Sequence, residues 1–177
     1  MGEYIPPIQD MRFTLEEVID VYSLAEIPVF SDVGLDSLPD LLEEAGRFFT
    51  QVISPTNRTG DLQGSSLNDD GSVTTPDGFK EAYAQYVEAG WGAISFDPEY
   101  GGGGFPWLVG IAITEMLTAA NMAMSLNPML TQGSIHALHA HGDSDLKLKW
   151  LPKLITGEWA GTMNLTEPQA GSDVGAL

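Results

Sequence analysis

Apolar side chains recur at the spacing of one helix face along most of this chain, and this periodicity constrains the fold more than any other feature. After Ser37 one such face is formed by Leu38, Leu41, Leu42, Ala45, Phe48, Phe49 and Val52. Ser37 is a good N-cap with Asp40 three residues later, and Pro55 predicts that this helix ends at Ser54. A shorter segment, roughly residues 14–24, repeats the pattern.

Four further helices are predicted from apolar faces bounded by residues that start and stop helices. One begins with Thr75 as N-cap and Pro76 at its first position, and it ends at Gly90. The next runs from Trp107 to about Ser125 and is hydrophobic nearly all round, which is typical of a helix buried in a bundle. The last two are opened by Pro128 and Asp143 and closed by Gly142 and Gly157.

The remaining segments are predicted to be loops and one strand. Residues 57–75 are rich in small polar side chains and predict a long surface loop, whereas the four glycines within 97–106 predict a flexible turn. Residues 159–165 alternate weakly and predict a strand, which a turn follows at 166–173. A lone strand cannot satisfy its own backbone groups, so we expect a mainly α chain that is the front part of a larger protein.

Charge and composition exclude several classes of partner. The 177 residues carry a formal net charge of −18, because 25 acidic side chains face seven basic ones that form no run. Nucleic acids and anionic membranes both require clustered Lys and Arg, so we expect neither as a partner. Cysteine is absent, which excludes disulfides, thiolate metal sites and cysteine catalysis. With no secretion signal and no long apolar span, the chain is expected to be soluble and cytoplasmic.

Three features outside the carboxyl end could indicate a functional site, but a structural role is favoured for each. The cluster His136, His139 and His141 lacks a fixed third ligand, so we expect no metal site there. Gly101–Gly104 is not followed by the Lys-Ser/Thr of a phosphate loop, so a turn into a buried helix is favoured. Glu115 lies inside the apolar helix, where we expect it either to pair with another helix or, less favoured, to do chemistry.

The carboxyl end is the strongest candidate for a ligand site. There the predicted strand leads into a turn with the hydroxyls of Thr166 and Ser172 and the backbone amides exposed by Gly171. Such donors suit a planar heterocycle or an anionic phosphate group. On chemistry alone, an ordinary turn remains an equal alternative.

Four stretches resemble the acyl-CoA dehydrogenase family, and together they cover most of the chain. The run LTEPQAGSD (165–173) matches a specific signature of the family, and PEYGGGG (98–104) resembles its Pro-Glu-x-x-Gly-Gly turn. The stretch 141–158 looks like the family's HG…K…LPKL..GE segment. The opening DMRFTLEEV (10–18) is similar to the extended amino terminus of a subfamily that includes 3-methylmercaptopropionyl-CoA dehydrogenase.

The resemblance implies a fold and a cofactor. Residues 1–157, with an extended amino terminus at 1–36, would form the amino-terminal helical domain, and residues 158–177 would begin a β-domain that carries the flavin-contact loop. The cofactor would be FAD, which the family uses to take a hydride from the β-carbon of an acyl-CoA. The implied flavin contacts are Met163, Leu165, Thr166, Gly171 and Ser172.

The resemblance also implies substrate contacts and partners. Ser172 would approach the bound thioester, and Met129, Thr131 and Gln132 would lie on one wall of the acyl pocket. The substrate would be an acyl-CoA, the electron acceptor an electron-transfer flavoprotein, and the full-length protein a homo-oligomer. The family's catalytic glutamate lies in a second helical bundle, so this chain carries no catalytic residue, and Glu167 belongs to the motif instead.

The sequence leaves two other functions open. The chain could be the front part of an acyl-CoA oxidase, which passes its electrons to oxygen. It could also be a non-catalytic helical binding module that has shed the active site. Under the dehydrogenase hypothesis, the 177 residues by themselves are predicted to have no dehydrogenase activity.

Overall fold

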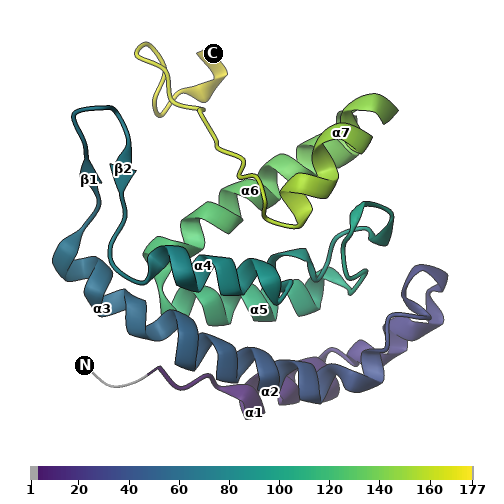
Figure 1. The fold of residues 1–177 in the computed structure, drawn as a ribbon. Coiled ribbons are helices and arrows are strands. Elements are labelled where there is room, and N and C mark those ends of the chain that lie inside the picture. Colours follow the sequence, from purple (N-terminus) through teal and green to yellow (C-terminus); the bar gives the residue numbers. More distant parts are fainter. Residues whose placement is uncertain (1–3, 177) are drawn as a thin grey trace.

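The computed structural model describes residues 4–176 and confirms a mainly helical chain (Figure 1). Its helices are α1 (Ile8–Phe13), α2 (Leu38–Phe48), α3 (Ser54–Gln63), α4 (Phe79–Glu88), α5 (Trp107–Ala120), α6 (Met122–His141) and α7 (Ser144–Ile155). Single 3-10 turns or short 3-10 helices occupy Val21–Glu26, Pro28–Phe30, Leu35–Ser37, Trp91–Ala93, Pro98–Tyr100 and Val174–Ala176. None of the helices in the described range is long and apolar enough to cross a membrane.

The first long helix does not end at Pro55, as the sequence predicted. A π-helical turn, Phe49–Ile53, joins α2 directly to α3, and Pro55 lies in the first turn of α3. Proline is tolerated there because the wide π turn already interrupts the regular i→i−4 hydrogen bonds. The predicted loop therefore begins only at Gly64, whose φ of 66° ends α3. Ser37 is the N-cap residue of α2, as predicted, but its hydroxyl donates backward to the Gly34 carbonyl and makes no capping bond to the helix.

The amino-terminal helix is displaced from its predicted position at 14–24. It starts at Ile8, continues through a π-helical turn at Thr14–Val18, and stops before Asp20, whose φ of 56° is left-handed. Its start packs closely on α2 at Gly46, where an added Cβ would lie 2.9 Å from the side chain of Ile8. Helix α1 thus lies against α2 (Figure 1).

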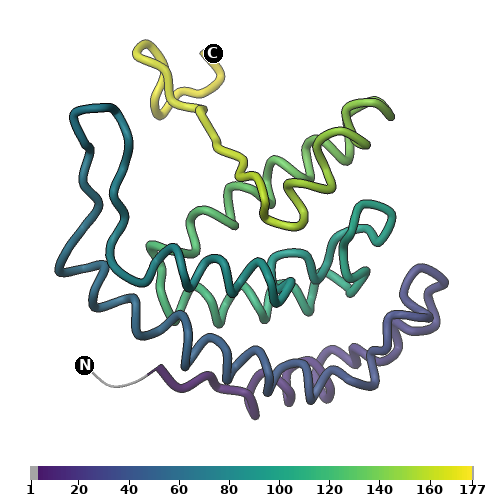
Figure 2. The backbone as a smooth tube through the Cα atoms, in the orientation of Figure 1, coloured from purple at the N-terminus to yellow at the C-terminus, as the bar shows by residue number. Residues whose placement is uncertain are grey.

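The predicted loop between α3 and α4 contains a small β-hairpin. Its strands β1 (Ser66–Leu67) and β2 (Val73–Thr74) pair antiparallel, and Figure 2 shows the hairpin projecting beyond the helices. The tip is held by Asp70, whose carboxylate accepts hydrogen bonds from the backbone and the hydroxyl of Ser72. After the hairpin, α4 begins at Phe79 with Gly78 as N-cap, so the predicted start at Thr75 and Pro76 is wrong.

The long apolar helix predicted over 107–125 breaks at Asn121. The backbone of Asn121 is extended, with φ of −157°, and its side chain accepts a hydrogen bond from Met124 N at 3.0 Å. Asn121 therefore starts α6, and Pro128 lies inside that helix instead of opening it. The bounds of the last helix are confirmed, because the Asp143 carboxylate caps Leu146 N at 2.9 Å and Gly157 follows with φ of 80°.

The main core lies between α2, α4 and α5. Its largest fully buried side chains are Phe49, Leu38, Leu42, Ile53, Ile113, Met116, Val21 and Val109. Phe49 is surrounded by the rings of Phe48, Tyr86 and Trp91, at centroid distances between 5.4 and 6.5 Å. A smaller core of Phe96, Tyr100, Ile135, Leu151 and Ile155 holds α7 against α6. Helix α5 is the central helix of the main core. Its inner side is buried, and its outer edge is exposed.

The glycine turn at 101–104 is tightly held, which corrects the prediction of a flexible turn. The amides of Gly102, Gly103 and Gly104 donate to backbone carbonyls of the preceding 93–97 segment at 2.9 to 3.0 Å. A Cβ on Gly102 would collide with the carbonyl of Phe96. The glycines are needed because two backbone segments approach closely there.

Candidate functional site

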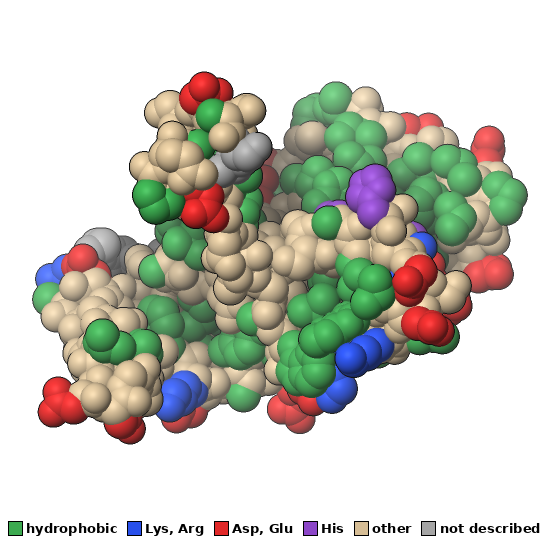
Figure 3. All heavy atoms as spheres, turned by 90° about the horizontal axis from the view of Figure 1, so that it is seen from above, with side chains coloured by type: hydrophobic (Ala, Val, Ile, Leu, Met, Phe, Trp, Pro, Cys, Tyr) green, Lys and Arg blue, Asp and Glu red, His purple; other side chains and the backbone are tan. Residues whose placement is uncertain are grey.

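The carboxyl segment leaves α7 at Gly157 and stands away from the helices. Seen from above, it forms a separate lobe beside the exposed hydrophobic side chains of the bundle (Figure 3). We call residues 163–173 the carboxyl lobe. The strand predicted over 159–165 is not formed, because no other strand of residues 4–176 lies beside it. The lobe is closed instead by a single bridge, in which Glu167 and Ala170 exchange backbone hydrogen bonds of 3.0 and 3.1 Å.

All five residues predicted to contact flavin lie on the surface of this lobe. They are Met163, Leu165, Thr166, Gly171 and Ser172, and each is exposed. Ala170 is only 2% exposed, so the side chain of this one residue is buried within the turn of the lobe. No hydrogen bond within the described range involves the Thr166 or Ser172 hydroxyl, so both can donate outward.

The three residues predicted for the acyl wall lie on α6 but on different faces. Met129 is exposed, Gln132 is half-buried and Thr131 is buried. The Thr131 hydroxyl donates to the Asn127 carbonyl at 2.9 Å and accepts from the Gly161 amide at 3.1 Å. Of the three side chains, only that of Gln132 lines the open hollow described next.

An apolar hollow of about 450 Å³ lies on the outer face of α5, with α6 at its edge. It is lined by Trp107, Ile111, Thr114, Glu115, Thr118, Ala119, Met122 and Gln132. We call it the α5–α6 hollow. A second hollow of about 400 Å³ lies between α1 and α5 and shares Ile111 and Glu115 with the first. Trp107, Ile111 and Met122 are each more than 40% exposed, so this apolar face is open in the described chain.

Glu115 is exposed, which overturns the expectation that it is buried among other helices. Its carboxylate lies between the two hollows, and within residues 4–176 it forms no ion pair. Burial and then the charge of Glu115 raise the pKa of the Tyr4 hydroxyl. The sequence misled here because α5 is apolar on its exposed edge as well as on its buried one.

Two of the three histidines of α6, His136 and His139, contact neighbouring side chains. The ring of His136 lies edge-on to Trp107 at 4.9 Å and also contacts Phe96 at 5.3 Å. His139 Nε2 lies 3.4 Å from Asp97 Oδ2, which ties α6 to the start of the glycine turn. Among the residues that the structure describes, no three His, Asp or Glu side chains are grouped as metal ligands would be.

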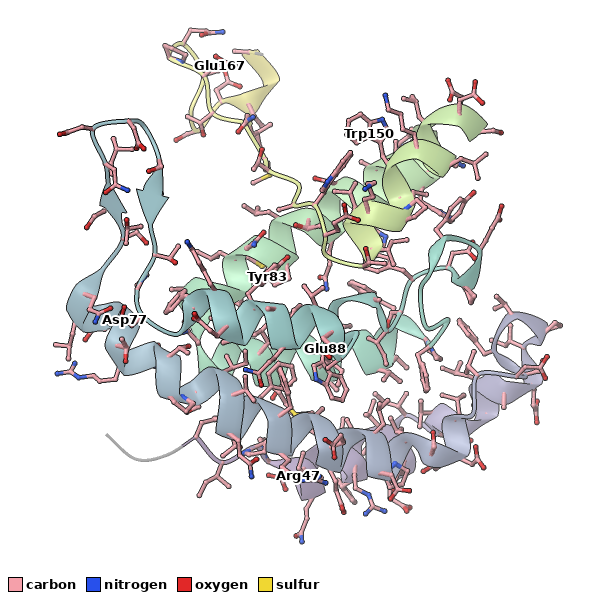
Figure 4. All side chains as sticks on the ribbon, in the orientation of Figure 1. Arg47, Asp77, Tyr83, Glu88, Trp150 and Glu167 are labelled. Atoms are coloured by element: carbon pink, nitrogen blue, oxygen red, sulfur yellow. The ribbon has the colours of Figure 1, made fainter. Side chains whose placement is uncertain are left out.

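The junction between α7 and the lobe was missed by the sequence analysis. The Tyr83 hydroxyl donates to the Gly157 carbonyl at 3.2 Å, and burial raises the pKa of Tyr83. The rings of Trp150 and Trp159 pack at 5.2 Å (Trp150 and Tyr83 are labelled in Figure 4). Tyr83 and Gly157 lie 74 positions apart in the chain, so no local pattern could have indicated their hydrogen bond.

Comparison with known proteins defines the class to which this helical fold belongs. Residues 39–158 match the family model described as acyl-CoA dehydrogenase, N-terminal domain. The chain therefore belongs to the acyl-CoA dehydrogenase family, and the resemblance drawn from its motifs is confirmed.

Two relatives and one solved structure show the similarity along the chain. It is 43% identical, over 97% of its length, to 3-methylmercaptopropionyl-CoA dehydrogenase of Ruegeria pomeroyi, and 33% identical, over 98%, to a butyryl-CoA dehydrogenase of Syntrophomonas wolfei. The structure of butyryl-CoA dehydrogenase from Megasphaera elsdenii superposes with a TM-score of 0.64 at 25% identity, covering 81% of this chain and 34% of that one. The chain spans about 29% of the length of these two relatives.

Proposed function

We propose that this chain is the amino-terminal portion of an FAD-dependent acyl-CoA dehydrogenase that introduces an α,β double bond into an acyl-CoA thioester. Residues 1–157 are its amino-terminal helical domain, and residues 158–177 begin the β-domain. The observation that carries the proposal is the exposed carboxyl lobe, whose residues 165–173 bear the family's signature. The family match over residues 39–158 supports the same conclusion from an independent part of the chain.

The chemistry of the carboxyl lobe fits a flavin. Thr166 and Ser172 offer short, uncharged hydroxyl donors, and Gly171 has no side chain to block its amide. Such donors hold a flavin ring or a pyrophosphate by hydrogen bonds without adding charge. Bound FAD would supply the acceptor for the hydride that leaves the β-carbon. The lobe residues would orient the ring, and Met163 and Leu165 would cover it with apolar surface.

The apolar α5–α6 hollow suits the acyl part of a substrate. Its surface is mainly apolar, although Thr114, Glu115 and Thr118 also line it, and Gln132 is the predicted acyl-wall residue that reaches it. Burial of an acyl chain there would be driven by the hydrophobic effect. The relative that acts on 3-methylmercaptopropionyl-CoA supports a short thioether acyl group as the substrate. Ser172 would lie closest to the thioester, Met129 would belong to the same wall less directly, and the buried Thr131 would support that wall without touching the acyl group.

The chain alone is proposed to be inactive, because in this family the catalytic glutamate lies in a second helical bundle. Its relatives are more than three times as long, which leaves room for that bundle. An electron-transfer flavoprotein would accept the electrons, and the complete protein would be a homo-oligomer.

Two protein samples test this function. Protein made from the complete natural reading frame should reduce an artificial electron acceptor when 3-methylmercaptopropionyl-CoA is added, whereas residues 1–177 alone should show no turnover. Hydrogen peroxide formation without an acceptor would instead identify an oxidase. Turnover by the 177 residues alone would overturn the proposal, and a complete protein without flavin would favour a binding module.

A further inference from the structure

We propose that Thr131 and Gly161 form an anchor that positions the carboxyl lobe relative to α6, and so relative to the wall of the acyl pocket. The inference rests on the proposed function, because the lobe matters for catalysis only if it contacts flavin. In this role Thr131 and Gly161 are positioning residues and touch no substrate themselves.

The first observation is a hydrogen-bonded chain from α6 to the segment that leads into the lobe. The Gly161 amide donates to Thr131 Oγ1 at 3.1 Å, and the same hydroxyl donates its proton to the Asn127 carbonyl at 2.9 Å. Thr131 is 5% exposed, so its hydroxyl is shielded from water and both bonds are stronger than they would be at the surface. The Thr131 hydroxyl therefore uses its hydrogen bonds to hold the segment that leads into the lobe, and it does not face a substrate.

The second observation is the absence of space at Gly161. A Cβ added to Gly161 would collide with the side chain of Ser134, which lies on α6 next to Thr131. Only glycine allows the backbone to approach α6 closely enough for the 3.1 Å hydrogen bond. Steric fit and hydrogen bonding thus both fix the position of Gly161 against α6.

A second set of contacts fixes the direction in which the chain approaches this point. Trp159 N donates to the Lys153 carbonyl at 3.0 Å, and the Trp159 ring packs on Trp150 at 5.2 Å. Lys153 Nζ lies 4.7 Å from the centre of the Trp159 ring and 2.6 Å from Glu158 Oε1. These contacts attach residues 158–159 to α7, the Tyr83–Gly157 bond attaches residue 157 to α4, and the Thr131 anchor then attaches residue 161 to α6.

Beyond Gly161 the lobe has no further attachment in the described chain. No hydrogen bond or ion pair joins residues 162–176 to the helices, and Met163 is 64% exposed. The position of the lobe is therefore set at Gly161. Because Thr131 precedes Gln132 on α6, the same turn of helix holds the lobe and lines the α5–α6 hollow.

The absence of cysteine allows a direct test on this chain without any cofactor. Spin labels on Ala137→Cys of α6 and Gln169→Cys of the lobe report the lobe's distance from α6, since both sites are exposed. We expect Thr131→Val, which keeps the shape but removes the hydroxyl, to broaden this distance distribution. Thr131→Ser, which keeps the hydroxyl, should retain the original distribution. The Gly161 amide should exchange with solvent about fivefold faster in Thr131→Val.

A matched pair of labels separates a local effect from unfolding. Labels on Ala137→Cys and Asp145→Cys, on α6 and α7, should give the same distance in all variants. If this control pair changes in Thr131→Val, the variant Gly161→Ala tests the same joint from the other side and should broaden only the lobe distance. An unchanged lobe distance in Thr131→Val, or in Gly161→Ala if the control pair changes, overturns the anchor.

The flavin readout distinguishes the failure of the anchor from the failure of the proposed function. In the complete protein, Thr131→Val should shift the reduction potential of bound flavin, and Thr131→Ser should restore it. If the wild-type protein binds no flavin, the proposed function fails whatever the label distances show. If flavin binds and its potential is the same in all three proteins, the anchor has no role in positioning it.

Discussion

The side-chain amide of Asn121 donates a buried hydrogen bond to the Thr56 hydroxyl at 2.8 Å and so joins α3 to the break between α5 and α6. The same side chain caps Met124 N, and Asn121 is 1% exposed. This one residue therefore marks the end of α5 and the start of α6, the helix that carries the predicted acyl-wall residues. Its two bonds explain why the apolar segment 107–141 folds as two helices.

Replacement of Asn121 should be costly. Asn121→Ala removes the cap and the buried bond to Thr56, and we expect a loss of about 2 kcal/mol in the free energy of unfolding. Asn121→Ser, which keeps a capping oxygen, should lose about half as much. Asn57→Ala, at an exposed neighbour of Thr56, should change stability by less than about 0.5 kcal/mol. Urea unfolding of the three variants measures these differences, and equal stabilities would contradict the role of Asn121.

Two glycines should respond in opposite ways to the same substitution. Gly102→Ala forces a Cβ into the Phe96 carbonyl and should destabilise the chain by about 3 kcal/mol. Gly133 lies inside α6 with open space around it, so Gly133→Ala should stabilise the chain by up to about 1 kcal/mol. Thermal unfolding followed by circular dichroism gives both signs. A neutral Gly102→Ala would mean that the glycine turn is looser than its hydrogen bonds indicate.

These residues also show which parts of the structure could be predicted from the sequence. The bounds of α7 could be predicted because its N-cap, Asp143, and the glycine that ends it, Gly157, lie within a few residues of the helix. The break at Asn121 was not readable, because its partner Thr56 is distant in the chain. Glu115 was misplaced because an apolar pattern does not tell a buried edge from one left open.

In the candidate site, too, features set by a local motif could be predicted and those that depend on distant segments could not. The residues of the carboxyl lobe were identified from a local motif, and the structure places them together on one exposed turn. The predicted strand at 159–165 depended on pairing with other strands, and none lies beside it within the described residues. The anchor between Thr131 and Gly161 joins segments that no local pattern connects.

The hairpin tip should depend on pH through Asp70. Hydrogen bonds from the hydroxyl of Ser72, and then from its backbone amide, hold the pKa of Asp70 below its ordinary value of 3.8. A carboxyl whose pKa is lowered on folding stabilises the fold above the unfolded value, and that contribution is lost as the pH falls through the lowered pKa. The Ser72 amide shift, followed by NMR, should therefore titrate with a midpoint below 3.8.

Two variants control this titration. Asp70→Asn should abolish the transition of the Ser72 amide, whereas Asp69→Asn, at the neighbouring tip residue, should leave it in place. A midpoint at or above 3.8 in the wild-type chain would show that the hairpin tip does not hold the ionised carboxylate.

The cap of α7 should contribute to the stability of the chain. Asp143→Ala removes the 2.9 Å bond to Leu146 N and should lower the free energy of unfolding by about 1 kcal/mol. Asp145→Ala removes an equal charge from the first turn without removing the cap and should cost less. The comparison by urea unfolding isolates the hydrogen bond from the charge. If Asp145→Ala costs as much as Asp143→Ala, the charge and not the cap stabilises the helix.

Hydrogen–deuterium exchange can detect contact between the carboxyl lobe and a flavin. The measurement compares the protein made from the complete natural reading frame with and without FAD. FAD should slow exchange in residues 163–173, including the amides of Gly171 and Ser172. Protection by FAD elsewhere in the protein, with none in residues 163–173, would contradict this contact.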